Sequence, residues 1–324
     1  MMPTEGLMPV PVVAGLIRDG HFLCLAGDEA ALRQLPPGNW IGGTIPYFMS
    51  AAGAVVSREL VYVQQIADFL SPPRLRFYDA ASLPQLCRNA PEHGYSLLIV
   101  PAFSACHSDF ARHAPNYEDM YLKPLAGWVA GTHLDDLGRA APRVVYGPTG
   151  QFSSELAVVM DVALPPSRFA HIDIVNRFKP GDGDAIRFAD TGFSAQACHI
   201  NGEPANLADY LSARQVDTRL PLVADYCGAS VNVSFKQVDT VAKRVEFYAP
   251  VFPGLSYRLA TPAAVPASLA VGGQAPATFA CNCILDFLYR GQDGRPAEGL
   301  AGPATFGEIG YQLLNQTEVY LTIR

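Results

Sequence analysis

Charged residues are scarce in this chain of 324 residues. Asp, Glu, Lys and Arg make up only 16% of it, hydrophobic residues make up 49%, and the formal net charge is -7. Globular domains usually carry about a quarter charged residues, so the composition indicates a compact, well-buried chain. The negative balance and the lack of any basic run exclude a nucleic-acid backbone as partner, because phosphate contacts need clustered Lys and Arg.

Targeting and membrane signals are missing as well. Residues 1–15 contain Glu5 and no positive charge, so they lack the basic start of a secretory signal. No stretch reaches about 18 uninterrupted apolar residues, which argues against a membrane-spanning helix. The seven cysteines are scattered without the spacing of a small disulfide framework. These absences predict a reduced, cytoplasmic protein.

Familiar catalytic and cofactor motifs are also absent. The chain has no Gly-x-Ser-x-Gly elbow, no Gly-x-Gly-x-x-Gly after a strand, no P-loop and no His-Glu-x-x-His. It therefore carries no local signature of serine hydrolase, nucleotide-binding or zinc-protease chemistry.

The chain does contain a repeat, which is marked by its two tryptophans. Residues 39–44 read Asn-Trp-Ile-Gly-Gly-Thr, and residues 127–132 read Gly-Trp-Val-Ala-Gly-Thr. Apolar, strand-like stretches flank both phrases, so a unit spanning about 20–66 recurs over about 95–162, with a loop insertion in the second copy. Such a repeat is one supersecondary unit used twice. We expect two halves related by a pseudo-twofold axis, with a ligand crevice between them.

Short β-like runs punctuated by Gly and Pro outnumber the helix candidates, which are residues 28–35, 82–89, 205–211 and 283–288. This pattern predicts an α/β fold, with α+β as the alternative, built from mixed β-sheets flanked by helices. The length exceeds that of a usual single core. We therefore expect a domain over residues 1–195 that contains the repeat, and a smaller domain over residues 196–324. The Ala-, Pro- and Gly-rich residues 261–276 indicate a surface loop.

Three further segments carry a family resemblance. Residues 200–205 read Ile-Asn-Gly-Glu-Pro-Ala, residues 279–281 read Phe-Ala-Cys, and residues 307–317 contain Gly-Glu-Ile-Gly and Asn-Gln-Thr. Together with the glycine-rich tryptophan phrases, their order resembles FIST-domain proteins, which are bacterial sensory proteins with an N-terminal and a C-terminal half. That family often carries an Arg soon after the Cys, whereas Asn282 and Cys283 follow Cys281 here. The departure puts an anion-binding role at this position in doubt.

The resemblance implies an intracellular sensory protein that binds a small molecule, such as an amino acid or a small carboxylate. No kinase, cyclase or helix-turn-helix motif follows the last segment, so signalling would need a partner protein. Two alternatives stay open. One is a stand-alone enzyme with a pocket built on Cys281 and Glu308. The other is a haem-binding gas sensor, because some FIST-type proteins bind haem non-covalently. Beyond haem, we expect no cofactor and no metal.

The tryptophan phrases supply most of the candidate ligand-binding residues. Glycines at strand ends let a backbone or a ligand approach closely, although they also serve simple tight turns. A threonine hydroxyl beside backbone N–H groups suits a carboxylate, and a tryptophan either stacks on a ligand or anchors a core. The candidates are Trp40, Gly42, Gly43, Thr44, Trp128, Gly131 and Thr132.

The C-terminal candidates are Cys281, Glu308 and Asn315. Cys281 and Cys283 share one face of a strand, so they could bind a soft metal, supply a nucleophile, or simply be buried thiols. Glu308, between two glycines, could accept a ligand ammonium, act as a base, or tie down its own turn. Asn315 is expected to hydrogen-bond loop backbone. We expect Cys281, Glu308 and the glycine–threonine phrases to converge on one pocket at the domain junction.

Overall fold

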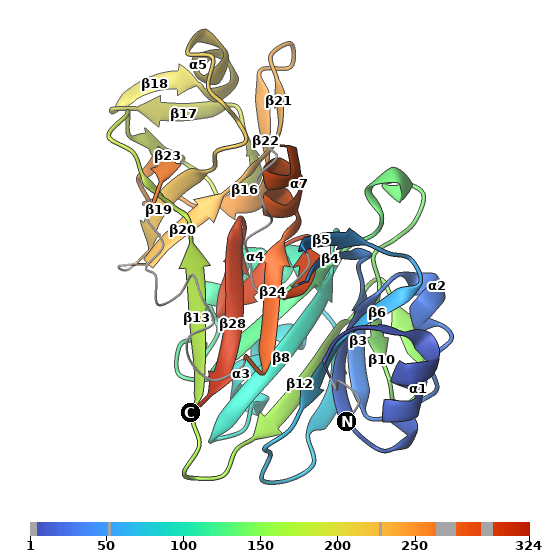
Figure 1. Ribbon diagram of the computed structural model, residues 1–324. Helices are drawn as coiled ribbons and strands as arrows, with labels where there is room; N and C mark the ends of the chain where they lie inside the picture. Colours follow the sequence, from blue (N-terminus) through green and yellow to red (C-terminus); the bar gives the residue numbers. More distant parts are fainter. Residues whose placement is uncertain (1–4, 51–52, 227–228, 264–276, 293–300) are drawn as a thin grey trace. The chain divides into compact units, whose positions relative to one another are not determined.

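The computed structural model describes residues 5–50, 53–226, 229–263, 277–292 and 301–324 (Figure 1). The predicted class is confirmed, because mixed β-sheets dominate and the helices are few and short. Of the surface loop expected at 261–276, residues 264–276 lie outside the described residues. Among the described residues, no helix is long and apolar enough to cross a membrane.

The chain forms two compact units whose limits differ from the boundary expected after residue 195. Unit 1 comprises Met1–Ile174, Ser268–Leu313 and Glu318–Arg324, and unit 2 comprises Val175–Ala267 and Leu314–Thr317. The smaller unit is thus inserted into the larger one. The reason is long-range pairing, since strands near the end of the chain complete sheets begun by the first half, and local sequence patterns do not report such pairing.

The first sheet of unit 1 has the strand order β1-β6-β2-β3-β10-β11. Its central pair, β2 and β3, is parallel, with Leu23 opposite Trp40, whereas its other neighbouring strands are antiparallel. Helices α1 (Val10–Arg18) and α2 (Glu29–Leu32) pack against this sheet through an apolar cluster that includes Val13, Leu23 and Leu32. The strands are β1 (Gly6–Pro9), β2 (Phe22–Gly27), β3 (Trp40–Thr44), β6 (Leu60–Ile66), β10 (Val144–Tyr146) and β11 (Gln151–Ser153).

The second sheet, read from its β7 edge, repeats this arrangement as β7-β12-β8-β9-β26-β27. Again the central pair, β8 and β9, is parallel, and β12 and β26 flank it antiparallel. The 3-10 helix η1 (Leu83–Gln85) and α3 (Leu86–Asn89) precede β8, and α4 (Ala105–His113) follows it. The strands are β7 (Arg74–Tyr78), β8 (Gly94–Pro101), β9 (Leu125–Ala130), β12 (Ala157–Ala163), β26 (Glu308–Gly310) and β27 (Gln312–Leu314).

A third sheet has the same pattern, which the sequence did not reveal. Its order is β13-β28-β24-β25-β4-β5, its central pair β24 and β25 is parallel, and α7 (Ile284–Gln292) connects that pair. Strand β28 is antiparallel to β24, and Phe169 and Arg324 exchange both backbone bonds beside β13, as antiparallel neighbours do. The strands are β4 (Tyr47–Ser50), β5 (Gly53–Val56), β13 (Ala170–Asn176), β24 (Phe279–Cys283), β25 (Gly302–Thr305) and β28 (Thr317–Ile323).

Unit 1 therefore contains three copies of one supersecondary unit. The hairpin that ends each copy pairs with the sheet of another copy. The hairpin β4–β5 follows β3 but pairs with β25, and β10–β11 follows β9 but pairs with β3. Strands β26 and β27 follow β25 and extend the sheet of β9. Along the chain, most of unit 2 lies between β13 and β24 of the third copy, at the position that α1 occupies between β1 and β2 of the first copy. The two copies seen in the sequence are thus two of three, and the expected pseudo-twofold relation is part of a cyclic exchange of hairpins among three copies.

The tryptophan phrases lie on equivalent strands, but not at equivalent positions. Trp40 is opposite Leu23, which is opposite Gln65 near the end of β6. Trp128 is opposite Ile99, which is opposite Val158 near the start of β12. The expected superposition of Trp40 on Trp128 is therefore wrong, although the expected repeat of the surrounding strands is present.

Unit 2 is a separate β-rich body. One sheet has the order β18-β17-β15-β23-β19-β20, with β14 also paired to β23, and a second sheet has the order β16-β22-β21. Phe188, Phe247 and Tyr257 lie in its core beside α5 (Leu207–Ala213), whose Asn206 cap accepts from the Asp209 amide. The strands are β14 (Phe178–Pro180), β15 (Ile186–Arg187), β16 (Gly192–Ala195), β17 (Ala197–Ile200), β18 (Glu203–Asn206), β19 (Leu222–Tyr226), β20 (Ala229–Val233), β21 (Phe235–Asp239), β22 (Arg244–Val251) and β23 (Tyr257–Pro262).

Candidate functional site

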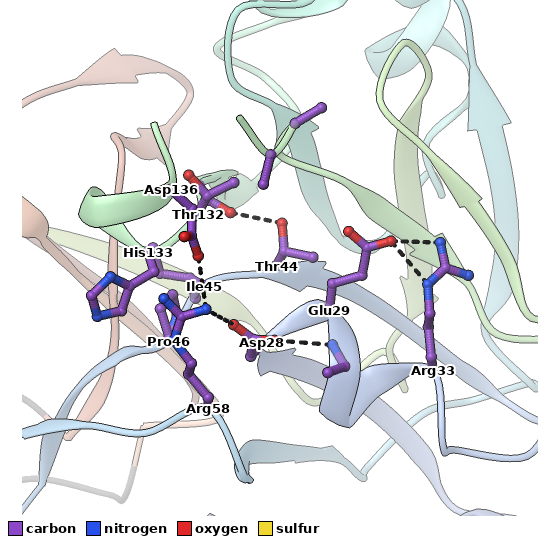
Figure 2. A pocket seen from close by; sticks show the side chains of 14 residues that line it. Asp28, Glu29, Arg33, Thr44, Ile45, Pro46, Arg58, Thr132, His133 and Asp136 are labelled. Carbon is purple, nitrogen blue, oxygen red and sulfur yellow. Dashed lines mark hydrogen bonds and ion pairs between the residues drawn. The ribbon is translucent and has the colours of Figure 1, made fainter. Parts of the chain in front are cut away.

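A pocket in unit 1 lies at the carboxyl ends of β2, β3 and β9. Carboxyl ends of parallel strands are where ligands bind in many α/β folds, because the chain leaves the sheet there and opens a crevice. The pocket has a volume of about 350 Å³. Its lining residues are Asp28, Glu29, Ala30, Arg33, Thr44, Ile45, Pro46, Arg58, Gly131, Thr132, His133, Asp136, Ala140 and Ala141 (Figure 2).

Thr44, the last residue of β3, fixes both ends of the loop that follows β9. Its hydroxyl donates to the Gly131 carbonyl at 2.7 Å, and its carbonyl accepts from the Gly131 amide at 2.7 Å. The Arg143 amide in turn donates to the Thr44 hydroxyl at 2.9 Å, and the Thr44 amide donates to the Arg143 carbonyl at 2.9 Å. The Thr44 side chain is therefore part of the pocket frame rather than a free ligand group.

Arg58 joins two carboxylates from different elements across the pocket rim. Figure 2 shows its guanidinium between Asp28, which caps α2, and Asp136, which lies in the 3-10 turn η3 (Leu134–Asp136). Arg58 Nη1 is 2.7 Å from Asp136 Oδ2 and 3.8 Å from Asp28 Oδ2. The hydrogen bond from Arg58 holds the pKa of Asp136 below its usual value, so this pair is fully charged at neutral pH.

A second charged group lines the other side of the pocket. Glu29 Oε1 accepts from Arg33 Nε at 2.9 Å and lies 3.2 Å from Arg143 Nε. The Arg33 guanidinium also stacks on the Phe152 ring, 4.2 Å from its centroid. Both guanidiniums use Oε1, and in Figure 2 the second carboxylate oxygen of Glu29 points away from Arg33. The pocket thus presents both carboxylates and guanidiniums to a ligand.

Thr132 and His133 follow directly after β9 and carry the uncharged polar groups of the pocket. Thr132 is 7% exposed, and its hydroxyl meets no hydrogen-bond partner among the described residues. His133 Nδ1 accepts from the Asp135 amide at 3.2 Å, which leaves the proton of the neutral imidazole on Nε2. Tyr47 packs against this imidazole with the ring centroids 5.4 Å apart.

Three of the ten residues predicted from the sequence line this pocket, namely Thr44, Gly131 and Thr132. Trp40 is instead part of the core beneath α1 and α2, and its indole donates to the Pro36 carbonyl at 3.0 Å. A Cβ on Gly42 would meet the Leu25 carbonyl and the Trp40 ring, and a Cβ on Gly43 would meet the Trp128 ring at 2.6 Å. These two glycines therefore serve close packing.

Cys281, Glu308 and Trp128 converge in the buried interior of unit 1 and do not line this pocket. All three are 0% exposed, and Glu308 lies opposite Trp128 in the pairing of β26 with β9. The Cys281 thiol donates to the Gly127 carbonyl at 3.3 Å. Burial, together with the nearby Glu308 and Cys24, raises the pKa of Cys281 well above its usual value. Cys281 and Glu308 thus meet Gly127 and Trp128 in the core, whereas Thr44, Gly131 and Thr132 line the pocket, so the one shared pocket expected for these residues is not found among the described residues.

Asn315 belongs to unit 2, where it hydrogen-bonds backbone as expected. Its side-chain amide donates to the Leu314 carbonyl at 3.0 Å. Its own carbonyl accepts from Asn232 at 3.1 Å. These bonds account for Asn315 as a structural residue of its turn.

Sequence reasoning missed the charged residues of the pocket, which are Asp28, Glu29, Arg33, Arg58, His133 and Asp136. Two signals pointed to them. Asp28 stands directly between an apolar strand and a helical pattern, which is typical of a helix cap. The loop insertion after the second tryptophan phrase contains His133 and Asp136, and inserted loops often carry function.

The fold and the pocket define a mixed β-sheet protein with three internal copies and a charged site at its strand ends. The chain belongs to a family of unknown function, DUF6976, whose model matches residues 8–324. No curated protein and no solved structure matches it.

Proposed function

We propose that this chain binds a small polar molecule, an amino acid or a small carboxylate, in the pocket between Thr44 and Thr132. The observation that carries the proposal is Thr132, which lines the pocket and whose buried hydroxyl has no hydrogen-bond partner among the described residues. An unsatisfied buried hydroxyl costs about 1–3 kcal/mol. A ligand oxygen at this wall would recover that cost.

The charges around the pocket favour a ligand that carries charge itself. The Arg58 guanidinium, about half exposed, and the Nε2–H of His133 suit a carboxylate, whereas Asp28 and the second oxygen of Glu29 suit an ammonium. An apolar ligand would leave these groups desolvated and unpaired, which is unfavourable.

The sensory part of the proposal depends on the resemblance to FIST-domain proteins. In a sensor of that kind the bound molecule changes the contacts with a partner protein, which passes the signal on. A pocket framed by charged residues from separate elements supports this role, because a ligand that replaces their ion pairs alters how the elements are held together.

The enzyme alternative needs Cys281 to act as a nucleophile, and the environment of this residue does not favour that role. A cysteine nucleophile must be a thiolate at working pH, and burial keeps this thiol protonated. For the haem alternative, His107 and His113 lie on the same helix, α4, six residues apart. Residues at this spacing do not share a helix face. Burial also lowers the pKa of His107 to about 4.

The test is a calorimetric titration and a thermal-shift screen with amino acids and small carboxylates. A true ligand stabilises the fold by mass action, by about 2.7 kcal/mol at a hundredfold excess over the dissociation constant. We expect Thr132→Val to weaken binding of the best compound about 10- to 100-fold, because one hydrogen bond to a charged group is lost.

Thr322→Val is the matched control. Thr322 on β28 is 6% exposed, its hydroxyl also lacks a partner among the described residues, and it does not line the pocket. The two variants remove the same group from equally buried sites, so they should change stability alike and differ only in binding. If both bind the compound equally well, the Thr44–Thr132 pocket is not its site. Consumption of the compound would instead favour the enzyme alternative.

A further inference from the structure

We propose that residues 131–143 form a hinged lid over this pocket. In this proposal the lid carries Thr132 and His133, which recognise the ligand, and the ion pair between Asp136 and Arg58 latches it. The inference rests on the proposed function, because it assigns a regulating element to the same site.

The three copies differ in the length of one link. The link that leads from the central parallel strand to the hairpin is Ile45–Pro46 in the first copy and Phe306–Gly307 in the third. In the second copy the same link runs from residue 131 to residue 143. The other two copies make this connection with two residues, so the sheet does not require the longer link. Five of its residues, including Thr132, His133 and Asp136, line the pocket besides Gly131.

One residue, Thr44, holds both ends of the loop in place. Gly131 and Arg143 each exchange hydrogen bonds with Thr44, through both its backbone and its hydroxyl. The two ends therefore stay together while the segment between them moves. A loop with closely held ends that packs on itself is typical of functional surface loops.

The segment between these ends is weakly attached to the rest of the chain. Its own bonds are internal, such as those from the Asp136 amide to the His133 carbonyl and from the Ala140 amide to the Asp136 carbonyl. Among the described residues, its polar bonds to the rest of the chain are two. The Tyr47 hydroxyl accepts from the Leu134 amide at 2.9 Å, and Arg58 pairs with Asp136 at 2.7 Å.

Of these two attachments, the ion pair between Arg58 and Asp136, which forms the latch, is the one exposed to solvent. The side chains of Arg58 and Asp136 are 47% and 29% exposed, and exposed ion pairs are readily exchanged for other partners. The lid is therefore closed but easily released. A molecule held between the pocket floor at Asp28 and Glu29 and the lid at Thr132 and His133 would add contacts that exist only in the closed state, so binding would favour closure.

The experiment is amide hydrogen exchange of the full chain, followed over residues 134–140. We expect Asp136→Asn to accelerate exchange there about two- to fivefold, the factor expected from the exposed ion pair with Arg58; the longer contact of Asp136 with Arg139, 3.6 Å, lies within the lid and is lost as well. Tyr47→Phe should accelerate exchange at the Leu134 amide. The control is Asp135→Asn, because Asp135 lies in the same turn, is 82% exposed and has no contact with Arg58 among the described residues. Equal exchange in the wild type and Asp136→Asn would overturn the latch.

A second arm tests the recognition role. Residues 131–143 are replaced by Ile-Pro, the link of the first copy, and folding is checked by thermal unfolding. Glycine and acetate serve as probes. They should slow exchange over residues 134–140 in the wild type, and the shortened variant should bind them at least about tenfold more weakly, because two recognition groups are gone. Undiminished binding would overturn the lid as a recognition element. If neither these probes nor any other compound binds the wild type, the proposed function fails, while the ligand-free exchange still decides the latch.

Discussion

At the scale of single residues, the cysteines of unit 1 behave as apolar core groups. Cys24 is 2% exposed and Cys281 is 0% exposed. Burial raises the pKa of Cys24 to about 12, and the nearby Trp128 indole opposes this shift only in part. Both thiols are therefore protonated in the folded state at neutral pH, as expected for free cysteines that pack as small hydrophobes.

Cys24 should make the fold sensitive to alkali. Its folded pKa lies above its ordinary value of 9.0, so the stabilising effect is fully present below that pH and is lost as the pH rises towards the folded pKa. From about pH 8 to about pH 10, the wild type should lose about 1 kcal/mol more unfolding free energy than Cys24→Ala. Urea unfolding of both proteins at each pH measures the difference. Parallel losses would show that this thiol does not titrate differently in the folded and unfolded states.

At the scale of elements, the interior of unit 1 depends on close contact between β3 and β9. Gly43 lies under the Trp128 ring, and a Cβ there would also come within 2.8 Å of Ile99. Both neighbours are fully buried and belong to other strands. The sequence feature that first looked like a ligand site is thus a packing site.

Gly43→Ala should lower the unfolding free energy by about 1–3 kcal/mol, the usual cost of overfilling a packed core. Gly15→Ala is the matched control, because Gly15 lies inside α1 and a Cβ there meets nothing within 4 Å. The same substitution in a helix should raise stability by up to about 1 kcal/mol. Chemical unfolding measures both changes in unfolding free energy. A loss for Gly43→Ala and a gain for Gly15→Ala would confirm that the loss comes from packing at β3 and not from glycine removal as such.

Element types were readable from the sequence where the pattern was local. Short apolar runs predicted strands such as β2, β6 and β12, and the helix candidate over residues 205–211 corresponds to α5. Helix α1 was not predicted, because Val10, Val12 and Val13 are weak helix formers and its buried face is set by tertiary packing. The register of the tryptophan strands was missed for the same reason, since the sequence of one strand does not determine which residues of the neighbouring strand lie opposite it.

At the scale of the whole molecule, the sequence revealed two of the three copies. The third was hidden because the residues of unit 2 interrupt it between β13 and β24, and because its central strand β25 carries no tryptophan phrase. The exchange of hairpins among the copies was equally invisible, since each exchanged pair joins strands far apart in the chain. The pocket depends on this exchange, because β10 holds the far end of its loop beside β3.

The threefold pattern predicts that unit 2 is dispensable for the fold of unit 1. Strands β13 and β24 both lie antiparallel to β28 on its two sides, so the link between them must cross over that strand. In the first copy a short segment around α1 makes the same crossing between β1 and β2. Replacing residues 177–277 by residues 10–21 should therefore leave unit 1 folded.

The shortened chain should unfold cooperatively and protect the amides of β24 and β28 from exchange as the full chain does. It should also bind any ligand of the Thr44–Thr132 pocket with unchanged affinity, because every lining residue belongs to unit 1. Asn315 and Gln316, which are buried in the full chain, would lose Asn232, Ser234 and Arg219 as partners, and water can replace these partners once the inserted residues are removed. Rapid exchange throughout β24 and β28 would mean that the inserted residues are needed to hold the third copy together, and that the copies are alike in topology but not in stability.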